Sequence, residues 1–260
     1  MAERFLLIEM TAVAVIYVVL IRRRDIRLSI SIEFGRASCF LAGICFLAVA
    51  LVGPVDVNAA GALSWHMVQH LLIISVAAPL LAVGRPVELF FELLPRRFAA
   101  RTYAWHGALV TMAAALAALA TLLVWHVPAL YQAALSSEAV HIVEHITLLV
   151  TSMWLWGALI GDGDSGTSVV WLFLFTLPTT ALGVAMTIAR TPWYADYVTT
   201  TSADAVRDQQ MAGVIMWAFG GLAALAGGVA LFASWLTGAS ATAPAGDHHP
   251  NPSAGAVPTC

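Results

Sequence analysis

The sequence has no lysine and few charged residues of any kind. Only 10% of its 260 residues are charged and 60% are hydrophobic, whereas soluble domains average about 25% and about 45–50%. The mean hydropathy is +0.86. A soluble protein of this size has too much surface to cover with so few charges, so we expect most of that surface to face lipid. Disordered and fibrous classes are excluded by the same composition.

Two further absences exclude other classes of protein. The net charge is only −3 and no basic stripe is present, so we expect no nucleic-acid partner. The three cysteines form no CxxC pair and no even-numbered framework, which excludes a disulfide scaffold.

Long apolar runs are what the chain has instead. A transmembrane helix needs about 20 mostly apolar residues to cross about 30 Å of hydrocarbon. Seven runs approach or meet this length: roughly 5–21, 37–53, 65–83, 104–125, 139–160, 168–189 and 210–236. The sequence therefore predicts an all-α, polytopic integral membrane protein with seven transmembrane helices in one domain, 1–236. The remaining 237–260, rich in Ala, Pro, Gly, Ser and Thr, is expected to be a disordered cytoplasmic tail.

The arginines predict the orientation of these helices. Nine of them fall in the 22–36 and 84–103 loops, and Arg4, Arg190 and Arg207 fall on the other side. Basic loops are retained in the cytoplasm, so we expect the N-terminus outside and the C-terminus cytoplasmic. The 54–64 and 126–138 loops then lie outside.

Histidines gather at the predicted outer ends of three of the runs. They are His66, His70, His126, His141 and His145. Their common side follows from the arginines and is therefore independent of the histidines themselves. Ionisable side chains inside spans are costly and tend to mark functional sites. His106 alone falls at the opposite edge, where we expect a helix–helix contact.

The spacing of these histidines favours a metal site. His66/His70 and His141/His145 are both i,i+4 pairs. Each pair projects from one helix face, so two such helices could complete a metal site. Glu144 is placed to act as a ligand or as the acceptor that fixes a tautomer. Met67 is a candidate auxiliary ligand, and imidazole with thioether suits copper, particularly Cu(I).

Two alternatives remain open at this point. His141, Glu144 and His145 fit the H-x-x-E-H pattern of inverted zinc peptidases, in which the glutamate is the general base. An intramembrane zinc-dependent hydrolase would also need a distant third ligand and a water-accessible cleft. A haem-binding membrane protein would use one histidine from each of two helices.

Four stretches, taken in order, resemble a known family. They are His-Met-Val-Gln-His at 66–70 with Pro-Leu-Leu at 79–81 and Gly-Arg-Pro at 84–86, Trp-His-Val-Pro-Ala-Leu-Tyr at 125–131, His-Ile-Val-Glu-His at 141–145, and Asp-Gln-Gln at 208–210 with Ala-Gly at 212–213 and Met-Trp at 216–217. Together they resemble the multi-span CtaG family of bacterial caa-type cytochrome c oxidase assembly factors. The resemblance covers roughly 35–235. One departure is Ala78-Pro79, where the family pattern has two prolines.

The resemblance implies a multi-pass protein of the bacterial plasma (inner) membrane that helps a haem–copper oxidase mature. Its partners would be cytochrome c oxidase subunits or assembly intermediates, its metal would be copper, and it would not be an enzyme. The five outer histidines are all motif residues of the family. Asp208 and Gln209 begin the seventh run on the same side, where we expect them to orient ligands.

Overall fold

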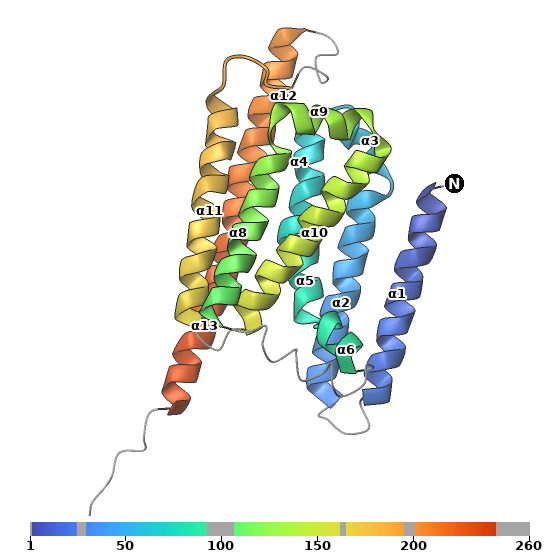
Figure 1. Ribbon diagram of the computed structural model, residues 1–260, viewed down its shortest axis with the longest axis vertical. Coiled ribbons are helices and arrows are strands. Elements are labelled where there is room, and N and C mark those ends of the chain that lie inside the picture. The colour runs from blue at the N-terminus through green and yellow to red at the C-terminus, as the bar shows by residue number, and fades with distance from the viewer. Residues whose placement is uncertain (1, 25–29, 93–106, 162–164, 195–200, 243–260) are drawn as a thin grey trace, which may run out of the picture.

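The structure is a computed structural model that describes residues 2–24, 30–92, 107–161, 165–194 and 201–242. Within these ranges the ordered elements are helices and no strand is present. The long helices stand side by side as one bundle (Figure 1). The predicted all-α fold class is confirmed.

The long helices follow the predicted apolar runs. They are α1 (Ala2–Arg24), α2 (Ile30–Leu51), α4 (Leu63–Leu71) continued by the π-helical η1 (Leu72–Ala77) and α5 (Ala78–Val83), α8 (Ala108–Trp125), α10 (Glu138–Gly161), α11 (Ser165–Ile188), and α12 (Ser202–Val214) continued by the π-helical η4 (Ile215–Phe219) and α13 (Gly220–Thr242). In the described part of the chain, six of these are long and apolar enough to cross a membrane. Helix α1 is not among the six, so the seventh span remains a prediction.

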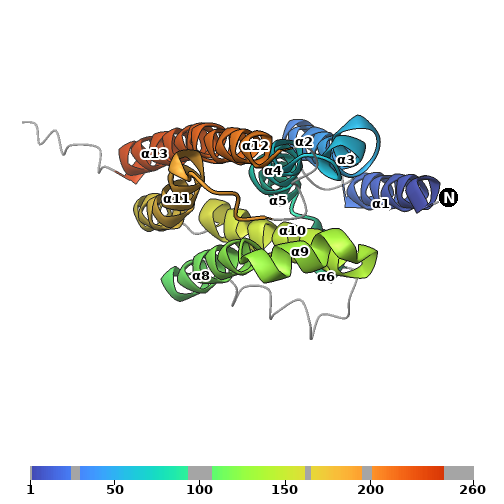
Figure 2. The same cartoon turned by 90° about the horizontal axis from the view of Figure 1, so that it is seen from above.

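The helix formed by α4, η1 and α5 lies at the centre of the bundle. It packs against α2, α10 and α12, and Figure 2 shows it enclosed by them. In the apolar 18-residue stretch of Leu63–Val83, 56% of the residues are buried, against 6% in the corresponding stretch of Ser202–Thr237. Helix α1 lies at the edge beside α2, where the Tyr17 hydroxyl donates to the Gly84 carbonyl oxygen at 2.6 Å. The central position of α4 carries its histidines into the interior.

Two predicted outer loops contain short helices. Helix α3 (Pro54–Ala59) lies in the 54–64 stretch and α9 (Pro128–Ser136) in the 126–138 stretch. Both begin with proline, whose missing N–H and fixed φ suit the first helical position. Helix α6 (Pro86–Glu92) begins in the same way at the other end of the bundle.

Each of two long helices contains a π-helical segment. In η1, the Trp156 indole N–H donates to the Ile74 carbonyl oxygen at 3.1 Å, and Pro79 follows shortly after. A proline ring collides with the carbonyl four residues earlier in a regular helix, so the wider π turns accommodate it. Such turns often occur at functional sites.

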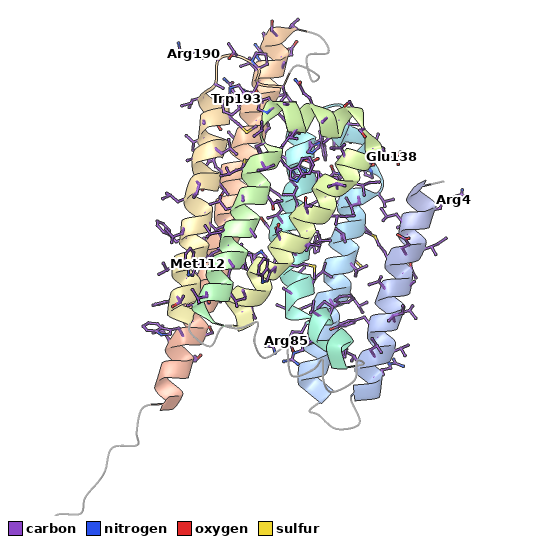
Figure 3. All side chains as sticks on the ribbon, viewed as in Figure 1. Arg4, Arg85, Met112, Glu138, Arg190 and Trp193 are labelled. Carbon is purple, nitrogen blue, oxygen red and sulfur yellow. The ribbon has the colours of Figure 1, made fainter. Side chains whose placement is uncertain are left out.

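The arginines separate toward the two ends of the bundle as predicted, where they are described. Arg4 and Arg190 lie toward the end with α3 and α9, and Arg85 lies toward the opposite end (Figure 3). The residues Arg27, Arg96, Arg97, Arg101 and His106 are outside the described ranges. Which end faces the cytoplasm remains a prediction.

The C-terminal boundary differs from the predicted one. Helix α13 continues to Thr242, so 237–242 are helical instead of part of a disordered tail. Ala239 and Ala241 of this stretch favour helix, and the stretch continues the preceding turns of α13. The rest of the predicted tail, 243–260, lies outside the described residues.

Candidate metal centre

Helices α4 and α10 each present one face of histidines to the same point in the bundle. The i,i+4 spacing puts His66 above His70 on α4, and His141 above His145 on α10. His126 follows the last turn of α8. We call these five histidines together with Glu144 the histidine cluster.

The five imidazoles form a continuous set of contacts. The Nε2 atoms of His66 and His70 are 2.9 Å apart. The ring of His66 lies 5.4 Å from that of His141, and the ring of His70 lies 5.4 Å from that of His145, measured between centroids. The His126 ring is 6.5 Å from that of His70. The structure thus brings together all five histidines that the sequence singled out.

Glu144 lies between the two helices, inside the histidine cluster. One carboxylate oxygen is 3.7 Å from His66 Nε2 and the other is 3.5 Å from His70 Nε2. The side chain is fully buried, and neither oxygen accepts a hydrogen bond from a described residue. A buried carboxylate is stable only when its charge is compensated or removed, so this position suits a cation.

Four members of the cluster meet closely enough to share one ion. One ligand atom each of His66, His141, Glu144 and His145 lies within 4.8 Å of the other three. An ion bound at about 2 Å needs ligand atoms up to about 4 Å apart, so a small closure of these side chains is sufficient. We call these residues the four-residue group. His141 is its least buried member and therefore marks the access side.

Unpartnered polar atoms are concentrated in the cluster. Buried side-chain atoms without a hydrogen-bond partner among the described residues include His70 Nδ1, His126 Nε2, His141 Nε2, His145 Nε2 and both Glu144 oxygens. Buried polar groups almost always have partners, and clustered exceptions need an explanation. These atoms are also the ones that a metal ion would use, so the residues fit a bound metal.

His126 has a defined tautomer. Its Nδ1 lies 2.8 Å from the Leu122 carbonyl oxygen, which only accepts, so Nδ1 carries the proton. Burial lowers the pKa of His126 to about 4, outweighing the opposing effect of that hydrogen bond. The ring is therefore neutral, with its lone pair on Nε2.

Tyr194 fixes the backbone of His126 from the other side. Its hydroxyl donates to the His126 carbonyl oxygen at 3.0 Å. Burial raises the pKa of the Tyr194 phenol, so it remains a donor. The ring also lies 4.4 Å from that of Tyr131, which in turn is 5.0 Å from His66. Neither tyrosine is predicted from the sequence as a site residue, although the 125–131 motif contains Tyr131.

Asp208 acts on the cluster through the start of α4. Its Oδ2 accepts a hydrogen bond from the Leu63 N–H at 2.6 Å, and its Oδ1 accepts from the N–H and the hydroxyl of Ser64. The residue before α4 is Ala62, which has no side chain able to cap a helix, so α12 supplies the cap. Asp208 therefore positions His66 without lying in the four-residue group.

Gln209 also supports the cluster indirectly, through the backbone. Its side-chain oxygen accepts from the Trp193 N–H at 2.6 Å, and its amide donates to the Thr191 carbonyl oxygen at 3.2 Å. It thereby holds the segment that leads to Tyr194. Met67 is buried in the apolar core with Tyr131 and belongs to a neighbouring cavity instead of the four-residue group.

A comparison with family models identifies the chain. The model described as cytochrome c oxidase caa3 assembly factor (Caa3_CtaG) matches residues 15–238. No curated protein and no solved structure matches. The match covers most of the chain and confirms the resemblance seen in the motifs. The protein therefore belongs to the cytochrome c oxidase caa3 assembly factor family.

Proposed function

We propose that this caa3 assembly factor binds copper at the four-residue group and holds it for a maturing haem–copper oxidase. Membership of the family supports an assembly role. The copper step is supported by one observation above the others, the concentration of unpartnered nitrogen and oxygen atoms in the buried histidine cluster. A scaffold without a metal would have no reason to leave them unpartnered.

The chemistry of the ligands favours copper over harder ions. Three imidazoles and one carboxylate surround the point where the ion would lie. Copper heads the divalent affinity order at nitrogen ligands, whereas magnesium and calcium prefer sites made of oxygen atoms. The carboxylate of Glu144 would also compensate the charge of the ion in a buried site.

The proposed location is the bacterial plasma membrane, with the cluster toward its outer face. The family and the long apolar helices indicate a multi-pass membrane protein. The positive-inside rule puts the end of the bundle that carries Arg85 in the cytoplasm. Copper would then enter past His141, and oxidase subunits or assembly intermediates would receive it.

Copper binding by a double variant tests the proposal. His66→Ala with His145→Ala removes one ligand from each of α4 and α10, so purified protein should lose its tightly bound copper. Ser152→Ala is the matched control, because Ser152 is a buried polar residue of α10 outside the cluster. Retention of wild-type copper affinity by the folded double variant would refute the proposal.

The same variant separates copper delivery from scaffolding in cells. If the protein supplies copper, the double variant should accumulate normally but give low caa-type oxidase activity. Added copper should partly restore that activity by mass action. Normal oxidase activity at wild-type protein levels would leave a scaffold role as the surviving account.

The structure supplies the hydrolase alternative with a third ligand but buries its general base. His66 lies beside His141 and His145, as a metallohydrolase would need. Glu144, however, is fully buried, and a general base must reach a water molecule. Zinc-dependent peptidase turnover that Glu144→Gln abolishes would favour this alternative, and a Soret band in the purified protein would favour haem binding.

A further inference from the structure

A cavity lies next to the histidine cluster, toward the middle of the bundle. Its volume is about 60 Å3, whereas one water molecule needs about 10–15 Å3 on the same measure. Its walls include His70, His126, Met67 and Met216. The space is large enough for an ion, and all four of these side chains carry atoms that bind soft metals.

His70 faces the four-residue group and the cavity at the same time. Its Nε2 lies 2.9 Å from His66 Nε2 and 3.5 Å from a carboxylate oxygen of Glu144. Its Nδ1 is on the other side of the ring and has no hydrogen-bond partner among the described residues. His70 is only 3% exposed and also lines the cavity. The geometry leaves Nδ1 available to a ligand that the four-residue group does not hold.

His126 offers a second nitrogen to the same cavity. Its Nδ1 is engaged by the Leu122 carbonyl oxygen, while Nε2 is buried and without a partner in the described part of the chain. The side chain is 8% exposed. A ring that donates from Nδ1 presents its lone pair at Nε2, which is the form that binds metals. His126 does not belong to the four-residue group.

Two methionines complete the set of donors. Met67 lies three residues before His70 on α4, and therefore on the same side of that helix. Met216 comes from η4, and both are buried in one apolar cluster. The π-helical η1 lines the cavity as well, through Ile74 and Ser75. Both π segments of the described chain thus border this space, as is frequent at functional sites.

We propose that His70 Nδ1, His126 Nε2 and the thioethers of Met67 and Met216 form a second metal site that takes Cu(I). Thioether sulfur selects Cu(I) over harder ions. His70 borders both sites, so a cuprous ion would pass between them without changing its oxidation state. The inference rests on the proposed function for the identity of the metal, but its ligands are different residues.

Anaerobic titration of the purified full chain with Cu(I), against a chromophoric Cu(I) chelator, tests the second site. Wild-type protein should bind two equivalents, and X-ray absorption should show sulfur ligation. Met216→Leu and, separately, Met67→Leu should each bind one equivalent and lose the sulfur signal. Leucine replaces methionine at similar volume, and Met186→Leu is the matched control, because Met186 is buried in the same core but does not line the cavity.

His141→Ala distinguishes the two proposals, because this residue belongs only to the four-residue group. That variant should keep one equivalent of Cu(I) with sulfur ligation. The wild type could instead bind one equivalent that His141→Ala removes and that Met216→Leu and Met67→Leu leave unchanged. That result would overturn the second site and leave the proposed function standing. No Cu(I) bound by the wild type would overturn the second site, and the absence of Cu(II) binding as well would overturn the proposed function. Two equivalents without any sulfur signal would also overturn the second site.

Discussion

The two halves of the bundle are built on different principles. The half with α3 and α9 contains the histidine cluster and most of the buried polar side chains that the structure describes. The other half has an apolar core of small and large residues, with Ala78, Ala115 and Ala118 packed against Leu155 and Trp156. Small residues let helices approach closely where lipid gives no hydrophobic driving force. Both halves thus contain an apolar core, and the chemistry lies in the half with the histidine cluster.

This difference predicts opposite responses to small changes. In the apolar half, added atoms should destabilise the protein wherever a side chain already fills the space. In the half with the cluster, polar groups are buried without hydrogen-bond partners among the described residues, so replacing a carboxyl group there should stabilise the protein while no metal is bound. Each half therefore offers a stability measurement that could contradict this difference between the two halves.

The largest effect is expected at Gly227 in the apolar half. A Cβ there would lie 2.7 Å from the indole ring of Trp156, and that ring is held by its hydrogen bond to the Ile74 carbonyl oxygen. Gly227→Ala should therefore destabilise the protein by about 1–3 kcal/mol. Thermal unfolding in detergent would measure the loss.

The neighbouring glycine provides the control. A Cβ at Gly228 would meet only a Leu172 methyl group at 3.9 Å, which is ordinary contact. Gly228→Ala should be neutral or stabilise the protein by up to about 1 kcal/mol, because alanine favours helix. Equal effects of the two substitutions would show that the apolar half is not tightly packed.

The next largest change in stability is expected at Glu144, and its sign depends on whether the metal is bound. Glu144→Gln replaces a buried carboxyl group that has no hydrogen-bond partner among the described residues, so the metal-free protein should become more stable by about 1–3 kcal/mol. The stabilisation by added copper should shrink, because a ligand and a compensating charge are lost. Unfolding temperatures with and without copper measure both effects.

Glu138→Gln is the matched control for that substitution. Glu138 begins the same helix but is exposed, so the change should alter neither the stability nor the response to copper. A loss of metal-free stability in Glu144→Gln would mean that the carboxylate is already satisfied in the folded protein. The proposed difference between the two halves would then be wrong.

Much of the fold could be predicted from the sequence because the physical signals are local. Each long helix follows an apolar run, and the i,i+4 spacing of His66/His70 and His141/His145 fixes which side chains share a helix face. The arginines then placed the histidines at one end. The short helices α3 and α9 were harder, because six- and nine-residue helices lack a long periodic pattern, and only Pro54 and Pro128 marked them.

The contacts that hold the site in place join distant parts of the chain and could not be predicted from the sequence. Asp208 caps α4 across 145 residues, and Tyr194 holds the His126 carbonyl across 68. No periodicity or spacing within one segment reports such a contact. The division of the histidine cluster was equally hidden, because it depends on which ring nitrogen of His70 and His126 is engaged. Sequence patterns identify the residues of a site more readily than the atoms that act in it.

The smallest change in stability, but an informative one, is expected at Asp208, which joins α12 to the start of α4. Asp208→Ala removes the cap of α4 and should destabilise the protein by about 0.5–2 kcal/mol. Because the cap fixes the first turns of the helix that carries His66, copper affinity should also fall by about 10–100-fold, the range found when supporting residues around a metal site are removed.

Asp204 is the control that separates these two effects. It lies one turn earlier on α12 and is exposed, and its carboxylate accepts a hydrogen bond from the Thr201 hydroxyl at 2.6 Å at the start of its own helix. Asp204→Ala should therefore weaken a helix end by a similar amount but leave copper affinity unchanged. Equal copper affinities in the two variants would mean that α4 holds its histidines in place without the cap from α12. A fall confined to Asp208→Ala would identify Asp208 as a positioning residue, because it acts on the metal through the backbone of α4.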